Sequence, residues 1–402
     1  MLNRRNLLKS SALAALAPTI PALFSDAVQA QDNERDSGDR ILVVIQLTGG
    51  NDGINTVVPF ADENYAKSRP TLRLRGNELI KLNDHLGFNA GMRAAADLLE
   101  DGRLAVVQGV GYPNPNRSHD VSMAIWQTAR LTKNEHGSLG WIGRATDTMD
   151  HVPKGTPHSI LLGTESPPTT LLGRRSVSGA FAHPSELRLS PHAQLPSIPT
   201  AATKDSLLAF AQRSVIEART TAGLVQQATR EDAMVRSLYP PTKLAERLKA
   251  IGQLIKSGFQ TPVYYAIQPG YDTHIAQRYR HLQLLEEWTG AMKGFLDDMK
   301  SSGLADRVSV LCFSEFGRRV EENASEGTDH GTAGPVFLAG VPIKPGLIGK
   351  TPKLDSEILV DGDLRSSIDF RQVYASVLKD WFNIPSSKIL AHADERTLPL
   401  FG

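Results

Sequence analysis

A near-continuous apolar run at residues 41–48, ILVVIQLT, is the feature that most constrains the fold of this chain. The run is rich in β-branched residues, which favour strands. A strand that is apolar on both faces must be covered on both sides, and such strands are typical of parallel sheets. A second run of this kind, VSVLCF at residues 308–313, lies far along the chain. We therefore predict a parallel sheet with helices on both faces.

Strand-like and helix-like segments alternate along the rest of the chain. Further strands are expected at residues 104–110, 159–162, 262–267 and 336–339, and helices at 90–99, 121–129, 141–149, 207–237, 245–257, 275–300 and 370–382. Within residues 275–300 the apolar positions recur every three or four residues, which gives one core-facing stripe. This alternation predicts an α/β fold, a three-layer, doubly wound and mostly parallel sheet.

Residues 1–30 have the pattern of a twin-arginine (Tat) signal peptide. Arg4 and Arg5 precede a mildly apolar run at residues 10–24, and VQA at residues 28–30 has the small residues of a cleavage site. The apolar run is too short to span a membrane. We therefore expect export to the periplasm by the Tat translocase, with no stable membrane anchor.

The remaining chain is expected to form a single domain. Residues 31–39, QDNERDSGD, are a polar linker, and residues 40–402 form the domain. Near residues 165–203 the sequence becomes rich in Pro, Ser and Thr and loses its periodicity, which predicts an irregular excursion over one edge of the sheet.

The charge balance argues against a nucleic-acid-binding protein, and the single cysteine argues against a disulfide-stabilised one. The chain has 44 basic and 43 acidic residues, and its formal net charge is +1. Without a basic stripe interleaved with aromatics, nucleic acid is not an expected partner. Cys312 lies inside an apolar run and cannot form an internal disulfide, so we interpret it as a buried small hydrophobe.

Acids, histidines and one serine follow four separate predicted strands. They are Asp52 in GGNDG, Ser118 and His119 in RSHD, Asp272 and His274 in GYDTH, and Glu315, Asp329 and His330 in SEFGRRVEENASEGTDHG. Because the carboxyl ends of parallel strands meet at one edge of a sheet, we expect these side chains to converge. Acids and imidazoles gathered there would hold one or two divalent cations. Zinc suits the histidines, whereas calcium, manganese or magnesium suits the carboxylates.

Each of these strand ends has a plainer interpretation when it is taken alone. The Asn-Asp-Gly around Asp52 is a common turn former, and Ser118 is among the best helix N-caps. Their coincidence at one sheet edge favours chemistry. A hydroxyl beside a metal and a helix N-terminus could attack phosphorus or sulfur, and Arg117, Arg318 or Arg319 could offset the charge of an oxyanion.

Six motifs in order along the chain resemble those of one bacterial family. They are LTGGNDGINTVVP, SHDVSMAIWQTA, GWIGR, GYDTH, SEFGR and GTDHG. On these motifs, which span nearly the whole chain after residue 40, the protein is identified as a member of the domain of unknown function 1501 (DUF1501) family. Members commonly carry a Tat leader and are regarded as distant relatives of the alkaline phosphatase and arylsulfatase superfamily. The resemblance implies an alkaline phosphatase-like fold.

The resemblance also implies roles for individual residues. Asp52 resembles the first metal aspartate of the superfamily, and Ser118 falls where its nucleophile lies, with Ser122 a weaker choice. The Asp272 and His274 pair resembles the acid and histidine of one metal site. Three further residues have counterparts: Glu315 resembles a second-site aspartate, His330 the late histidine that closes the first site, and Asp329 a ligand or a neighbour of one. His119, Arg117 and Arg318 would support the ligands or the substrate.

These residues predict a metal-dependent hydrolase of a phosphate or sulfate ester, carried by a small molecule or a glycan. Two departures narrow the prediction. Phe316 stands where relatives often have a histidine ligand, and the Cys/Ser-x-Pro-x-Arg signature of sulfatase maturation is missing, which argues against a formylglycine sulfatase. Two alternatives remain open: a non-catalytic periplasmic binding or assembly protein, and a metal-free hydrolase in which His119 or His274 is the general base for Ser118.

Overall fold

The computed structural model describes residues 39–132, 139–153, 156–181, 238–390 and 396–402. The chain divides into two units, 1–36 and 37–402, and all described residues belong to the second. The expected signal peptide, the expected linker up to residue 38 and the helix expected at 207–237 lie outside the described residues. Within the described part, no helix is both long enough and apolar enough to cross a membrane.

The main sheet is mixed but mostly parallel. Its spatial order is β11 (Gly346–Ile348), β5 (Leu104–Gly111), β10 (Gly334–Ala339), β9 (Val308–Phe313), β1 (Ile41–Thr48), β8 (Val263–Pro269), β6 (Ser159–Leu162) and β7 (Ser178–Phe181), with β12 (Ile368–Asp369) beside β5. Only β10 runs antiparallel to its neighbours, β5 and β9, among the described strands of this sheet. The prediction of a mostly parallel sheet is therefore confirmed.

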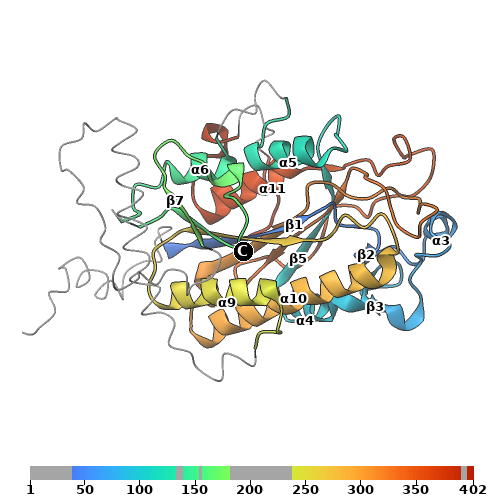
Figure 1. The fold of residues 1–402 in the computed structure, drawn as a ribbon, viewed down its shortest axis with the longest axis horizontal. Helices are drawn as coiled ribbons and strands as arrows, with labels where there is room; N and C mark the ends of the chain where they lie inside the picture. The colour runs from blue at the N-terminus through green and yellow to red at the C-terminus, as the bar shows by residue number, and fades with distance from the viewer. Residues whose placement is uncertain (1–38, 133–138, 154–155, 182–237, 391–395) are drawn as a thin grey trace, which may run out of the picture. The chain divides into compact units, whose positions relative to one another are not determined.

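Helices cover both faces of the sheet, which gives the three expected layers (Figure 1). One face carries α4 (Arg93–Glu100), α9 (Lys243–Lys256) and α10 (Gln277–Ser301), and the other carries α5 (His119–Thr128), α6 (Trp141–Thr146) and α11 (Phe370–Ser376). β1 shows why two layers of helices are needed. Its odd-numbered apolar residues, Ile41 to Leu47, join the core under α4, α9 and α10, whereas Leu42 and Val44 join the opposite core. Alternate side chains of a strand point to opposite faces.

Several elements differ from the expectation in extent. α5 begins at His119, earlier than the predicted residue 121, and α10 begins at Gln277. The last predicted helix ends as an α-helix at Ser376 and continues as a π-helical segment, Val377–Trp381. The start of the excursion is ordered, because β7 extends the sheet at its edge. The excursion beyond residue 181 lies outside the described residues.

A small second sheet was not predicted. Its order is β2 (Val57–Val58), β4 (Gly87–Asn89) and β3 (Leu79–Lys81), and the short helix α3 (Glu63–Ser68) lies between β2 and β3 in the sequence. Short 3₁₀ segments lie at Gly76–Glu78, Ala90–Met92, Thr169–Leu171, Ala305–Arg307 and Ser386–Lys388. The short strands of this second sheet have too few residues to show a period in the sequence.

The strand directions place the candidate chemistry at one edge of the main sheet. β1, β5, β8 and β9 all run the same way, so their carboxyl ends lie on the same edge. β10 runs the opposite way and therefore begins at that edge. All the residues predicted to form the site lie in the segments that follow β1, β5, β8 and β9, the last of which leads into β10.

Candidate metal centre

Three histidines and one aspartate meet at the carboxyl edge of the sheet. His119 is the first residue of α5, Asp272 and His274 follow β8, and His330 lies in the loop before β10. Asp272 Oδ1 lies 3.0 Å from His274 Nε2, 3.1 Å from His330 Nε2 and 3.5 Å from His119 Nε2. The Nε2 atoms of His274 and His330 are themselves 3.0 Å apart. We call these four residues the histidine cluster.

The Nδ1 atom of each imidazole, which points away from the cluster, lies within hydrogen-bond distance of an oxygen that can only accept. His119 Nδ1 lies 2.8 Å from Glu315 Oε1, His274 Nδ1 lies 3.0 Å from Asp329 Oδ1, and His330 Nδ1 lies 2.8 Å from the backbone oxygen of Arg117. A carboxylate or a carbonyl can only accept, so each Nδ1 must be the donor. In the neutral rings each Nε2 is then a bare lone pair that points into the cluster.

The centre of the cluster is therefore rich in electrons and could accept a proton or a metal cation. Two facing Nε2 lone pairs cannot bond to each other, and Asp272 adds negative charge beside them. His119 Nε2 is buried and has no hydrogen-bond partner among the described residues. The ligand atoms of His119, Asp272 and His330 all lie within 4.8 Å of one another. Nitrogen ligands of tetrahedral zinc are roughly 3.3 Å apart, given bonds of about 2.0–2.1 Å, so the spacing fits a zinc-sized ion.

Outer carboxylates and carbonyls that orient metal-bound histidines are typical of metal centres. The hydrogen bond from His119 to Glu315 raises the pKa of the imidazole against the opposing effect of its burial. Burial raises the pKa of Asp272, but the hydrogen bond and the charge of Arg318, together with the neighbouring imidazoles, outweigh that effect and lower it to about 2. Asp272 is thus charged at neutral pH and can serve as a ligand.

The histidine cluster is open to solvent on one side. The Asp272 side chain is 50% exposed and that of His274 is 38% exposed, whereas the His330 side chain is 23% exposed. Structural zinc sites are closed, and an accessible centre is the kind that meets a substrate. On the inner side Phe316 forms an apolar wall, with its ring centroid 4.9 Å from that of His119 and 4.8 Å from that of His330.

Arg318 holds Asp272 and the neighbouring loops in place through hydrogen bonds. Its guanidinium is buried and donates to Asp272 Oδ1 at 2.8 Å. It also donates to the backbone oxygens of Gly50, Tyr271 and Thr328, at 2.7, 2.9 and 2.6 Å. One side chain therefore ties the loops after β1 and β8 to the loop that carries His330. These donors are committed, so Arg318 does not present a free cation to a substrate.

Glu315 and Asp329 lie one step outside the cluster. Glu315 is fully buried, and its Oε1 accepts from His119 Nδ1 and from the Gly49 amide at 2.9 Å. Asp329 accepts from His274 and from the Asn323 side-chain amide at 3.1 Å. Both carboxylates face the Nδ1 side of an imidazole. The geometry therefore gives Glu315 an orienting role, whereas the sequence predicted it as a ligand.

The structure does not bring Asp52 to the cluster. Its Oδ2 accepts from Arg69 and from Gln277, each at 2.5 Å, and its Oδ1 accepts from the Asn55 amide at 3.3 Å. Burial raises the pKa of Asp52, but the paired charge of Arg69 outweighs it and the pKa is lowered. With both oxygens engaged by protein donors, Asp52 holds the loop after β1 to Arg69 and α10.

Ser118 and Arg117 lie on the exposed rim beside His119. Ser118 is the N-cap position of α5, but its side chain makes no capping hydrogen bond. Ser122, by contrast, is fully buried and donates to the backbone oxygen of Glu315 at 2.5 Å. The Arg117 guanidinium donates to Asp363 Oδ2 at 2.7 Å, while its backbone oxygen holds His330. Ser118 is exposed, and its hydroxyl makes no hydrogen bond to another described residue, whereas Ser122 is buried.

His119 is the cluster member to which the sequence gave only a supporting role. It stands next to the serine at a helix start, and its imidazole reaches the cluster because Glu315 fixes its ring. The sequence signal was present in the Ser118–His119 pair, but nothing in it showed on which side the ring would lie. Gln277, which donates to Asp52, and Asn323, which holds Asp329, were not predicted.

Comparison with known families gives one match along nearly the whole chain. The family described as "Protein of unknown function (DUF1501)" matches residues 39–391. No curated protein matches the sequence.

Similar solved structures are distant in sequence. They include the C-terminal periplasmic domain of EcEptC from Escherichia coli in complex with Zn, which is 10% identical with a TM-score of 0.37 over 75% of this chain and 73% of that one. A protein in the alkaline phosphatase superfamily from Vibrio parahaemolyticus is 10% identical with a TM-score of 0.36 over 78% and 63%. The PsFucS1 sulfatase from Pseudoalteromonas sp. is 13% identical with a TM-score of 0.35 over 90% and 73%. We draw nothing on activity from likenesses this distant.

Proposed function

This chain belongs to the DUF1501 family of proteins of unknown function, and from its histidine cluster we propose that it is a metal-dependent hydrolase of a phosphate or sulfate ester. We further propose that the Tat route exports it to the periplasm, on the sequence of residues 1–30. One observation carries the enzymatic proposal. Three imidazoles with fixed outer hydrogen bonds direct their bare Nε2 atoms at one another and at Asp272.

His119, His274, His330 and Asp272 would hold the ion, and Glu315 and Asp329 would orient two of the rings. Zinc is the ion that three imidazole nitrogens and one carboxylate oxygen suit best. When bound, it would supply a Lewis acid for an ester oxygen and a counter-charge for an oxyanion. The open side of the cluster leaves room for a substrate to approach.

Ser118 is the proposed nucleophile. Its hydroxyl is exposed, adjoins His119 and is not used to cap α5. In the proposed reaction Ser118 Oγ forms a bond to phosphorus or sulfur, and the ester oxygen leaves as the alcohol with the serine proton. In the second step the oxygen of a water bonds to the same phosphorus or sulfur, the bond to Ser118 Oγ breaks, and phosphate or sulfate leaves while a proton from the water restores the hydroxyl. The substrate ester would belong to a small molecule or a glycan.

A non-catalytic binding or assembly protein is the second candidate, and one observation favours it. Arg117 and Arg318, which the sequence offered as partners for an oxyanion, are engaged by Asp363 and by Asp272 with backbone oxygens. An enzyme of this kind usually aims a cation or a donor at the charge that develops in the transition state. The metal ion would have to meet that need alone.

The test measures bound metal and turnover on the purified protein. We expect about one zinc ion per chain, hydrolysis of an aryl phosphate or an aryl sulfate, and loss of metal in the His119→Ala and His330→Ala variants. His85, which is exposed and lies outside the cluster, provides the matched control, and His85→Ala should keep the metal. Ser118→Ala should keep the metal and lose at least about a thousandfold in turnover, as nucleophile removal typically does.

The outcomes separate the two candidates. Metal without turnover of either ester supports the binding protein. A metal-free chain that still hydrolyses esters, with His119→Ala inactive, supports the metal-free hydrolase. A chain that binds no divalent ion at micromolar concentration would overturn the metal centre itself.

A further inference from the structure

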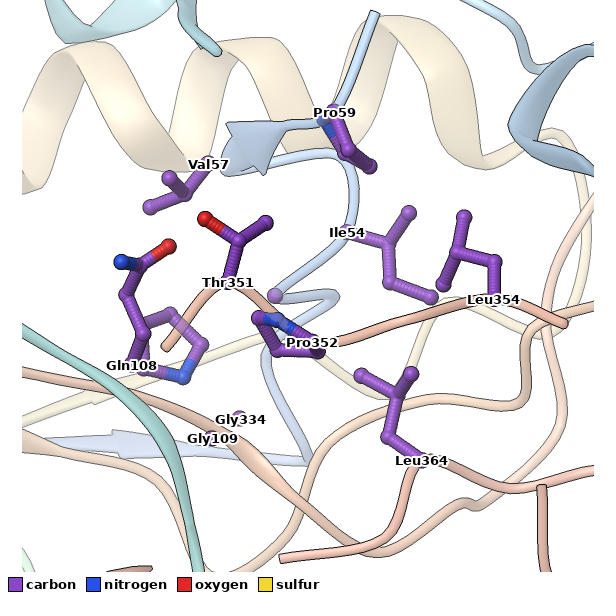
Figure 2. Close-up of a pocket in the computed structure, with 12 residues that line it drawn as sticks. Ile54, Val57, Pro59, Gln108, Gly109, Gly334, Thr351, Pro352, Leu354 and Leu364 are labelled. Carbon is purple, nitrogen blue, oxygen red and sulfur yellow. The ribbon is translucent and has the colours of Figure 1, made fainter. Parts of the chain in front are cut away.

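A second hollow lies at the same sheet edge but apart from the histidine cluster (Figure 2). Four segments enclose it: the chain after β1, the end of β5, the start of β10 and the strap at residues 351–364. The hollow opens to solvent, and its empty space of about 390 Å³ includes part of the open mouth. Among its lining residues are none of the proposed metal ligands.

The walls of this cavity are almost entirely apolar. The apolar lining side chains are Ile54, Val57, Pro59, Pro335, Pro352, Leu354 and Leu364. Figure 2 shows Val57, Pro59 and Leu354 around one open space. Thr351 stands at the exposed mouth. A concave apolar site with a few polar groups is the usual form of a small-molecule pocket.

Gln108 is the polar group inside it. This side chain is only 4% exposed, and its amide has no hydrogen-bond partner among the described residues. Figure 2 draws the amide next to Val57 and Thr351. Its amide atoms are not among the fully buried polar atoms that lack a partner, so solvent in the open cavity reaches them and a ligand could take the place of that solvent.

The other buried glutamines of the described chain show the contrast. Gln46 donates to Thr48 and accepts from Tyr265, at 2.8 and 2.5 Å. Gln268 donates to the backbone oxygen of Leu284 and accepts from Tyr271, at 3.1 and 3.0 Å. Gln277 is bonded at both ends as well, through Asp52, Thr273 and Thr328. Gln108 alone among them keeps both a free donor and a free acceptor.

We propose that this cavity is a binding site for a small neutral molecule that has a compact apolar body and an amide-like donor and acceptor. The body would fill the space between Ile54, Leu354 and Leu364. The polar end would pair with the Gln108 amide, one hydrogen bond in each direction. We expect a neutral ligand, because none of the described residues that line the cavity is charged.

The test uses benzamide as the probe, since it joins one flat apolar ring to one carboxamide. Ligand-observed NMR on the full chain should show saturable binding with a Kd of about 1 mM, as expected for a ligand of this size. Gln108→Leu should weaken benzamide about tenfold, the usual loss for a hydrogen bond to a buried group. Ethylbenzene, which lacks the carboxamide, should bind both proteins equally.

A second variant closes the mouth without touching the interior. Thr351→Phe places a large ring at the exposed entrance and should abolish benzamide binding. Lys353→Phe adds the same ring two residues along the strap, at an exposed position outside the lining, and should bind like the wild type. Thermal unfolding serves as the control for folding: Gln108→Leu should unfold at about the wild-type temperature, because the side-chain amide makes no hydrogen bond to another described residue that the substitution would remove.

Two results would overturn the site. One is benzamide binding that does not saturate in the wild type. The other is equal affinity in the wild type, Gln108→Leu and Thr351→Phe, which would place the probe elsewhere on the surface.

Discussion

Asp52 and Asp272 occupy matching places in the sequence and opposite environments in the protein. Each follows a buried strand, β1 or β8, and these two strands pair side by side. Asp52 is completely buried and bonded to Arg69 and Gln277. The Asp272 side chain is half exposed and faces three imidazoles. A carboxylate at a strand end can thus be a structural anchor or a ligand, and the difference lies in what packs against it.

The loops after β1 and β8 pack closely against each other, and this packing directs Asp52 and Asp272 to different places. Gly49 has a φ of +121°, and a Cβ there would come within 2.3 Å of the Asp272 amide nitrogen. Only glycine allows this contact between the two loops. Arg318 also joins the two loops, because it donates hydrogen bonds to the backbone oxygens of Gly50 and Tyr271. With the loops locked, Asp52 is directed toward Arg69 and Asp272 toward the open edge.

The largest effect should come from Asp52→Asn. Arg69 would then be a buried cation without its carboxylate, and breaking a buried pair in this way costs about 3–5 kcal/mol. We expect thermal unfolding several degrees below that of the wild type, while zinc stoichiometry measured on the folded protein stays the same. The matched variant is Asp272→Asn, which should lose zinc affinity at least about a hundredfold. It should cost less stability than Asp52→Asn, because the Asp272 side chain is half exposed and Arg318 keeps its backbone acceptors. If Asp52→Asn instead lost its zinc and kept its stability, the two roles would be reversed.

Glu315→Gln should have the next largest effect. The charge that holds His119 Nδ1 would be gone, and changing the outer partner of a metal-bound histidine typically costs about 10–100-fold in metal affinity. Competition with a chelator measures the change. Asp329→Asn provides the comparison and should cost less, because Asp329 is exposed to solvent. Wild-type affinity in Glu315→Gln would show that His119 is not a ligand.

The smallest effect should be the loss of stability in acid that Asp52 contributes. The pKa of Asp52 is lower in the folded protein than its ordinary value of about 3.9. Its contribution to stability is therefore fully present above the unfolded pKa, and is lost as the pH falls through the lower, folded pKa. The unfolding temperature of the wild type should fall as the pH drops below about 4. Asp52→Asn should fall less over this range, and an equal fall in both proteins would contradict the assignment.

Much of the fold could be predicted because the apolar runs carry a clear period. The run ILVVIQLT predicts a strand buried on both faces, and β1 is paired on both sides within the sheet. The three- and four-residue spacing in residues 275–300 predicts α10 within two residues at its start. The second sheet and β12 escape prediction because strands of two or three residues are too short to show a pattern.

The site was predicted less completely, for a reason visible in particular residues. Asp272, His274 and His330 were chosen as ligands and lie in the histidine cluster, whereas Asp52 and Glu315 were also chosen and lie outside it. His119 was predicted only to support the ligands or the substrate, and it lies in the histidine cluster. All six stand at the right sheet edge, because strand direction follows from the alternation of strands and helices. Which nitrogen or oxygen faces the centre depends on side-chain hydrogen bonds that no spacing reveals.

The sequence by itself determined the layers of this protein, the edge at which its chemistry gathers and the residue types that gather there, because hydrophobic period and strand order are local properties of the chain. Only the tertiary structure decided that Asp52 pairs with Arg69, that Glu315 turns His119 toward Asp272, and that the Gln108 amide is buried without a hydrogen bond to another described residue. Each of these results depends on contacts between segments far apart in the sequence. Burial and hydrogen bonding across such contacts set the charge, the tautomer and the role of each side chain.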